Sequence, residues 1–138
     1  MQYDDTPRMN TTENARRMLD TAAETVHLLT QEKDRAVAER VISRCRQWLA
    51  EQTVSGAELL DLLDNEFNGI TLREEAAADP TECAVWNCII DAAAYTARLA
   101  YEAAQCRFLP EPLEMADASV LPHFEACYRE CKRRDHHE

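Results

Sequence analysis

The chain has little glycine, few aromatic residues and no apolar run in its first ten residues. Only two of its 138 residues are glycine, and aromatic side chains, which favour strands, make up 7%. Ala, Leu, Glu and Arg are plentiful, and these residues favour helices. Residues 1–10 contain charges and no apolar run, so we expect neither a signal peptide nor a membrane span. The composition therefore predicts one cytoplasmic, all-α domain with no sheet.

Motifs that cradle phosphate or activate a nucleophile are also missing. The sequence has no glycine-rich phosphate loop and no Gly-x-Ser-x-Gly turn. It has no Cys-x-x-Cys pair either, and without an export signal we expect its cysteines to be reduced and mostly structural. These are Cys45, Cys83, Cys88, Cys106, Cys127 and Cys131.

Apolar residues at spacings of three and four predict two helices in the first fifty residues. The first helix should begin near Thr12 and run to about Leu29. After a polar break at residues 30–32, the second should pair with it antiparallel. Ser55 and Glu58 then form a capping-box pattern, which predicts the start of a third helix.

Asp79-Pro80-Thr81-Glu82 is the clearest helix start in the chain. Asp79 can cap the helix, Pro80 suits its first position, and Glu82 stands where the partner of the cap belongs. We predict a long central helix over about residues 80–106. It is apolar around most of its surface, with one narrow polar stripe made of Asn87, Asp91, Arg98, Glu102 and Gln105.

Two prolines interrupt the chain after this helix. Residues 109–113 should be extended because each proline pushes the residue before it out of helical geometry. Ser119 should cap a last helix with a basic end. We thus expect residues 1–138 to form a single bundle of about five to six helices, with residues 1–10 and 133–138 flexible.

Two groups of side chains have spacings that metal ligands can use. Glu24 and His27 share a helical face, but a di-iron bundle needs a second such pair and two further glutamates, which are missing. His123, Cys127 and Cys131 lie four residues apart and could offer zinc up to three ligands, although the geometry is poor over two turns. We interpret both groups as structural and predict no metal site.

Negative charge is concentrated in the middle of the chain. Residues 51–125 carry fifteen acids and three arginines, a balance of −12, whereas residues 1–50 are neutral and residues 126–138 carry +1. These three balances add to the net charge of −11. Such a domain should repel nucleic acid and anionic membranes and favour a basic partner.

One segment resembles a known protein family. Residues 86–101 read WNCIIDAAAYTARLAY, and the proline-bearing stretch and His123-Phe124 follow them. This pattern resembles an all-helical family of bacterial polymorphic-toxin immunity proteins. The matching positions are Trp86, Ile89, Asp91, Ala92, Tyr95, Ala97, Ala100, Tyr101, Leu109, Pro110, Pro112, Leu113, His123 and Phe124.

The resemblance implies an immunity protein that binds and neutralises the toxin C-terminal domain encoded beside it, without catalysis. Many such toxins act on nucleic acids or nucleotides and have basic clefts, which an acidic inhibitor can reach quickly by electrostatic steering. We expect no catalytic residue and no cofactor, and a monomer or homodimer when the protein is free. The predicted toxin-facing surface consists of Asp61, Asp64, Glu66, Glu74, Glu75, Asp79 and Glu82.

Two other interpretations stay open from sequence. The same carboxylates would suit an acidic mimic of nucleic acid that occupies the groove of a DNA- or RNA-binding protein. A weaker interpretation is a small metal-dependent helical enzyme built from His27, His123 or the cysteines. Bound metal in the purified protein would favour the enzyme, and a phage gene neighbourhood would favour the mimic.

Overall fold

The structure is a computed structural model that describes residues 5–63, 69–77, 79–104 and 117–136. Within these ranges the chain forms six α-helices, one 3₁₀ helix and no strand. The prediction of an all-α, single-domain bundle is therefore confirmed. No helix in the described ranges is both long and apolar enough to cross a membrane. The elements are α1 (Asp5–Thr25), η1 (Val26–Leu28), α2 (Glu32–Glu51), α3 (Gly56–Leu63), α4 (Ile70–Ala76), α5 (Pro80–Ala103) and α6 (Asp117–His136).

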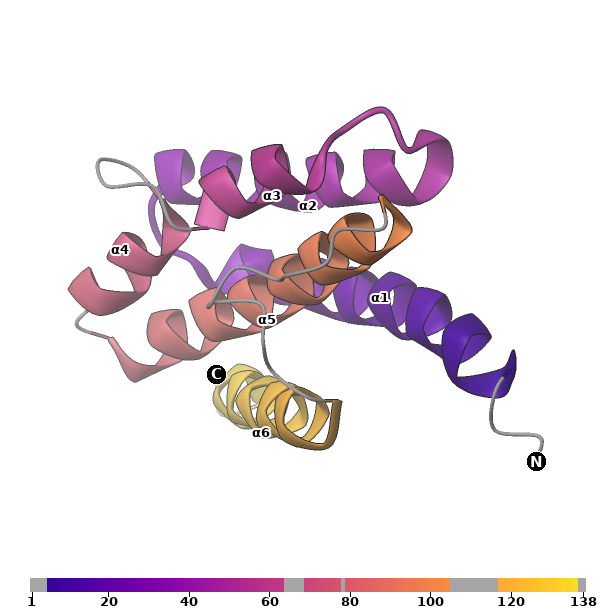
Figure 1. The fold of residues 1–138 in the computed structure, drawn as a ribbon. Helices are drawn as coiled ribbons and strands as arrows, with labels where there is room; N and C mark the ends of the chain where they lie inside the picture. The colour runs from indigo at the N-terminus through magenta and orange to yellow at the C-terminus, as the bar shows by residue number, and fades with distance from the viewer. Residues whose placement is uncertain (1–4, 64–68, 78, 105–116, 137–138) are drawn as a thin grey trace.

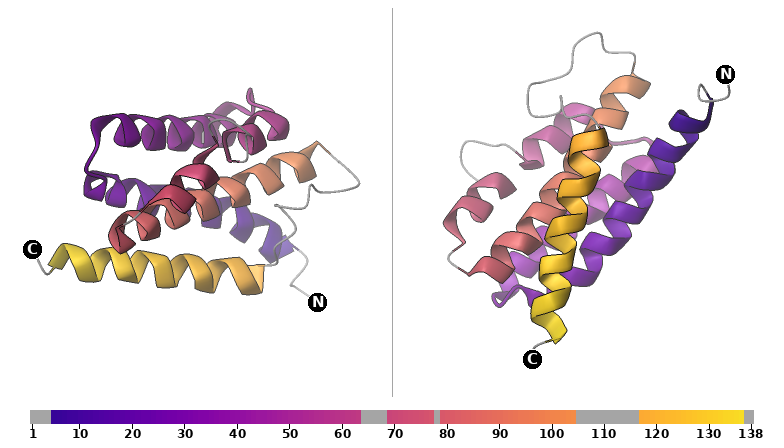
Figure 2. Two further views of the ribbon diagram at one scale, coloured as in Figure 1. Left: turned by 90° about the vertical axis from the view of Figure 1, so that its left-hand side faces the viewer. Right: turned by 90° about the horizontal axis from the view of Figure 1, so that it is seen from below.

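The helices form three layers with α5 at the centre (Figures 1 and 2). α2 and α3 lie on one side, α1 and α5 in the middle, and α6 on the opposite side. α1 and α2 pack antiparallel, as their apolar spacing predicts. α5 contacts each of the other five α-helices, so the predicted long central helix is confirmed. It ends at Ala103, and predicted residues 105–106, like the predicted extended stretch at 109–113, lie outside the described ranges.

The buried face of α5 supplies much of the core. Trp86 is only 1% exposed, and bulky partners from α1, α2, α3 and α4 are buried around the same cluster. The apolar residues of α5 that are buried include Val85, Trp86, Cys88, Ile89, Ala92, Ala93, Tyr95, Ala97 and Leu99. Burial of these side chains from several directions is what makes α5 the element on which the other helices assemble.

Two helix starts form as their residue patterns predict. The backbone N–H of Glu58 donates to Oγ of Ser55 at 3.1 Å, and the backbone N–H of Ser55 donates to Oε1 of Glu58 at 3.0 Å. These reciprocal bonds are the two halves of a capping box at the start of α3. At the start of α5, Oδ1 of Asp79 accepts from the backbone N–H of Thr81 at 3.1 Å, and Pro80 follows the cap.

The prediction for Glu82 is only partly right. Its Oε2 does not return to the cap of its own helix but accepts from the backbone N–H and the hydroxyl of Thr30, at 3.0 and 2.7 Å. Glu82 therefore fastens the connection between η1 and α2 to the first turn of α5. Spacing within one helix could not reveal this contact, because its two residues are 52 positions apart.

The first and last helices begin earlier than predicted. α1 begins at Asp5 and not near Thr12, and Pro7 falls in its first turn, where a missing N–H costs nothing. α6 begins at Asp117, so Ser119 lies inside the helix and is not its cap. Helix thus extends into both ends of the chain that are predicted to be flexible. Flexibility itself stays a prediction.

The polar stripe on α5 is used for contacts inside the bundle. Asn87 donates to the backbone carbonyl of Cys83 at 3.0 Å, and the guanidinium of Arg98 lies 4.7 Å from the ring centre of Tyr95. Nε of Arg98 is 4.0 Å from Oε2 of Glu102, which confirms the expected pair at positions i and i+4. Most of this stripe therefore lies against neighbouring groups and is only partly open to solvent.

Candidate functional site

Five of the seven acids predicted to face a toxin lie in the described ranges. Asp61 is on α3, Glu74 and Glu75 are on α4, Asp79 caps α5, and Glu82 is in the first turn of α5. α3 contacts α4, and α4 contacts α5, so these acids belong to three adjoining elements (Figure 1). Asp64 and Glu66 lie outside the described residues.

The five acids differ in how freely a partner could reach them. Asp61, Glu75 and Asp79 are exposed. Glu74 and Glu82 are half-buried and form hydrogen bonds within the bundle. Oε2 of Glu74 accepts from the thiol of Cys83 at 3.2 Å, and Oε2 of Glu82 accepts from Thr30. We name the exposed trio Asp61, Glu75 and Asp79 the acidic surface.

An exposed leucine lies within this region. Leu72 on α4 is 39% exposed. Among the described residues, it is the one large hydrophobic side chain that is exposed to solvent. Glu75 follows three residues later, which places both on neighbouring positions of the helix surface. An exposed apolar side chain beside a carboxylate is a combination that interface anchors and their polar rims share. Sequence reasoning missed Leu72, because a single leucine in a short helix gives no periodic signal.

A groove of about 300 Å³ borders the acidic surface. It lies between α2, α3 and α4, and two arginines interrupt the negative charge there: Arg40, and Arg73, whose Nη1 is 2.5 Å from Oδ1 of Asp34. The region is thus a mixed surface and not a continuous sheet of carboxylates. The groove is lined by Val37, Arg40, Val41, Asp61, Leu62, Ile70 and Arg73.

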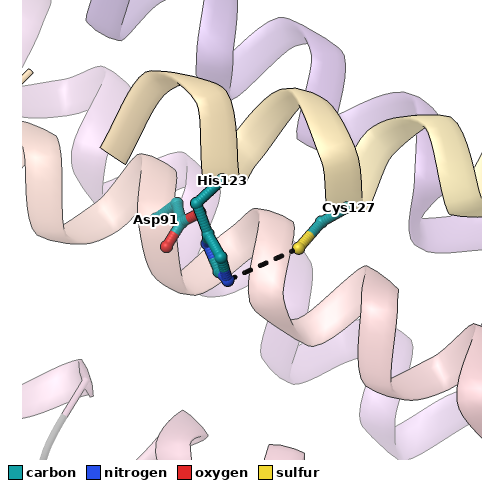
Figure 3. A group of neighbouring side chains, drawn as sticks. All are labelled: Asp91, His123 and Cys127. Carbon is teal, nitrogen blue, oxygen red and sulfur yellow. Dashed lines mark hydrogen bonds and ion pairs between the residues drawn. The ribbon is translucent and has the colours of Figure 1, made fainter. Parts of the chain in front are cut away.

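A second polar cluster lies where α5 meets α6 (Figure 3). Oδ2 of Asp91 is 2.6 Å from Nδ1 of His123, and Nε2 of His123 is 3.9 Å from Sγ of Cys127. One ligand atom from each residue lies within 4.8 Å of the others. Asp91 is buried at 5% exposure, Cys127 is half-buried, and His123 is exposed.

Comparison with known protein families decides the class. The family model described as Immunity protein Imm6 matches residues 13–131, which is 119 of the 138 residues. The chain belongs to the Imm6 family of immunity proteins. The resemblance found in residues 86–124 is thereby confirmed at the level of an immunity family. Searches of curated proteins and of solved structures found no match.

In this Imm6 immunity protein, the Asp91–His123–Cys127 cluster brings together three side chains with reactive groups. Its atoms follow the order carboxylate, imidazole, thiol, which is also the order in nucleophilic triads. Burial, and then the nearby charge of Asp91, raises the pKa of the Cys127 thiol to about 11. The thiol is therefore protonated at neutral pH, whereas a catalytic cysteine needs a lowered pKa. The geometry alone does not make Cys127 a nucleophile.

In this Imm6 protein, His123 and Cys127 of the predicted stripe lie together, whereas Cys131 is buried in the core. Side chains four residues apart on a helix drift by roughly 40° per step, so the third turns away from the face of the first. Cys131 is buried and its thiol is hydrogen-bonded with that of Cys88, a contact that together with burial raises the pKa of Cys88. Asp91 from α5, and not Cys131, is the third member of the cluster with His123 and Cys127. Sequence spacing could not supply Asp91, although Asp91 and His123 both belong to the positions that match the family.

The other candidate pair, Glu24 and His27, makes contacts with neighbouring groups of the bundle. Oε1 of Glu24 accepts from the hydroxyl of Tyr128 on α6 at 3.0 Å. Nδ1 of His27, in η1, lies 2.8 Å from the backbone carbonyl oxygen of Glu24. The carboxylate thus contacts a tyrosine hydroxyl and the imidazole a backbone carbonyl, and the interpretation of the pair as structural stays a prediction.

Proposed function

We propose that this immunity protein neutralises a basic toxin domain by binding it through the acidic surface and Leu72. Family membership supplies the class of partner, a cognate toxin. The exposed Leu72 on the same helix as the exposed Glu75 supports this location, and it is the observation that carries the proposal. Inhibition is non-catalytic and proceeds by covering a toxin surface, of which a nuclease or nucleotide-binding cleft is the best match in charge.

Charge and apolar contact have different tasks in this proposal. The acids accelerate encounter with a basic domain, because opposite charges raise the association rate constant at low ionic strength. Leu72 acts after encounter, since its side chain loses contact with water only when the toxin covers it. The two contributions can therefore be separated in the association and dissociation rate constants.

The first test is capture of the partner. Tagged protein should be expressed in its host with and without the product of the adjacent gene, and bound chains identified by mass spectrometry. We expect one-to-one capture of a basic toxin C-terminal domain. Capture only of nucleic-acid enzymes of the host or a phage, with no toxin, would contradict the proposal and favour the nucleic-acid mimic.

Neutralising the acidic surface should slow binding to the captured toxin. The triple variant Asp61→Asn, Glu75→Gln, Asp79→Asn removes three charges, and Asn at position 79 keeps an oxygen for capping α5. We expect the association rate constant at low salt to fall about tenfold and the difference from wild type to shrink as salt increases. Surface plasmon resonance at several ionic strengths measures both quantities.

A matched triple separates local charge from net charge. Glu13 on α1, Glu39 on α2 and Glu125 on α6 are exposed acids on other parts of the molecule. Changing all three to glutamine alters the net charge by the same amount. If the control lowers the association rate constant as much as the first triple variant does, only net charge matters. The proposal that the toxin binds at the acidic surface would then be wrong.

Truncating Leu72 should act on dissociation. The variant Leu72→Ala removes an exposed apolar side chain, so we expect little change in stability but about a tenfold weaker complex. The loss should appear mainly as a faster dissociation rate constant, because no charge is changed. An unchanged dissociation rate would show that the toxin does not cover α4.

A further inference from the structure

The cluster between α5 and α6 brings together three side chains of types that bind metal ions. His123 and Cys127 are four residues apart on α6, so their side chains leave the same face one turn apart. Their Nε2 and Sγ atoms are 3.9 Å apart (Figure 3). Zinc bonds of about 2.1 Å to nitrogen and about 2.3 Å to sulfur, at tetrahedral angles, place two such atoms roughly 3.6 Å apart. We propose that His123 Nε2 and Cys127 Sγ bind a thiophilic divalent cation, for which Zn²⁺ is the best fit.

Asp91 sets the imidazole in the form that a metal requires. Its Oδ2 lies 2.6 Å from Nδ1 of His123. An ionised carboxylate can only accept, so this contact favours the ring tautomer in which Nδ1 carries the proton and donates. The lone pair of the ring is then on Nε2, the atom directed at Cys127. Histidines that bind zinc nearly always donate their other nitrogen to a carboxylate or carbonyl in this manner. Asp91 is therefore a positioning residue and not a direct ligand.

The surroundings suit a cation with positions left open. Thiolate and imidazole together favour Zn²⁺ over the harder Mg²⁺ and Ca²⁺. The side chain of His123 is 49% exposed, so water can complete the coordination from the solvent side. The donor atoms of all three residues lie within 4.8 Å of one another, which brings the carboxylate close enough to offset the charge of the ion. On binding, the Cys127 thiol loses its proton to solvent and a sulfur–metal bond replaces the S–H bond.

A cobalt titration of the free, untagged protein tests this site. Co²⁺ takes zinc positions and shows a thiolate-to-metal charge-transfer band in the near ultraviolet, which requires a cysteine ligand. We expect one equivalent of Co²⁺ to produce the band and one equivalent of Zn²⁺ to remove it. Absence of the band under reducing conditions would overturn the proposal.

Conservative variants assign the ligands. Cys127→Ser and His123→Gln should each abolish the band, while Asp91→Asn should keep it and weaken affinity about 10- to 100-fold. Cys83→Ser is the matched control, because Cys83 is half-buried as Cys127 is. Cys83 differs in its place, since it lies on α5 and its thiol donates to the carboxylate of Glu74. It should bind Co²⁺ as wild type does. Circular dichroism of each variant verifies that the helical fold is retained.

Two results would contradict the assignment. A band that persists in Cys127→Ser would come from another thiol, and a band lost in Cys83→Ser would move the site toward α4. The titration uses no toxin, so its outcome is independent of the proposed function. Metal binding can fail while toxin binding succeeds, and the reverse is also possible.

Discussion

Replacing Trp86 with alanine should lower the free energy of unfolding by about 3–5 kcal/mol. The indole is 1% exposed and belongs to α5, the helix that contacts every other α-helix. The substitution removes its burial and leaves a cavity that the surrounding helices can fill only in part. Since domains of this size are stable by about 5–15 kcal/mol, the loss is a large share of the total. Urea unfolding followed by far-ultraviolet circular dichroism measures it.

Two companion variants make this result specific. Leu72→Ala removes an exposed apolar side chain and should change the free energy of unfolding by less than about 0.5 kcal/mol. Trp86→Phe keeps an aromatic ring and should cost less than Trp86→Ala. A loss below about 1 kcal/mol for Trp86→Ala would contradict the central position of α5.

The fold was predictable to the extent that its signals are local. Ser55 with Glu58, and Asp79 with Pro80, start helices through contacts within four residues, so pattern and structure agree. Apolar spacing likewise identified α5 as the helix buried on most sides. The early start of α1 was missed although Asp5 and Pro7 are both residues that suit a first helical turn. The first residues of this helix contain no apolar stripe, so hydrophobic periodicity gives no signal for a helix there.

The candidate sites depend on contacts between distant residues, and those could not be predicted. Glu82 has the right spacing for a capping partner, yet a competing pair of donors on Thr30 takes its carboxylate. Asp91 is one member of a polar stripe in the sequence, and only the packing of α6 on α5 gives it His123 as a partner. Charge content, in contrast, is additive along the chain. It therefore predicted an acidic protein without showing which acids are exposed.

Gly56 is a glycine because of the space that Tyr101 occupies. Its backbone is not left-handed, so conformation does not demand glycine there. A Cβ atom at position 56 would lie 2.7 Å from Cδ2, 2.9 Å from Cε2 and 3.2 Å from Cγ of Tyr101. The close approach extends to the root of the ring, so a small rotation about the end of the side chain does not relieve it. α3 and α5 pack this closely only because residue 56 has no side chain.

The variant Gly56→Ala should therefore lower the free energy of unfolding by about 1–3 kcal/mol, the usual cost of overpacking. This direction is opposite to that of an ordinary helical position, where alanine is favoured over glycine by about 1 kcal/mol. In a Tyr101→Ala background the obstacle is gone, so the same substitution should become neutral or stabilising. A double-mutant cycle measures the change of sign. Equal effects in both backgrounds would show that Tyr101 is not what excludes a side chain at position 56, and that α3 and α5 are not packed at this distance.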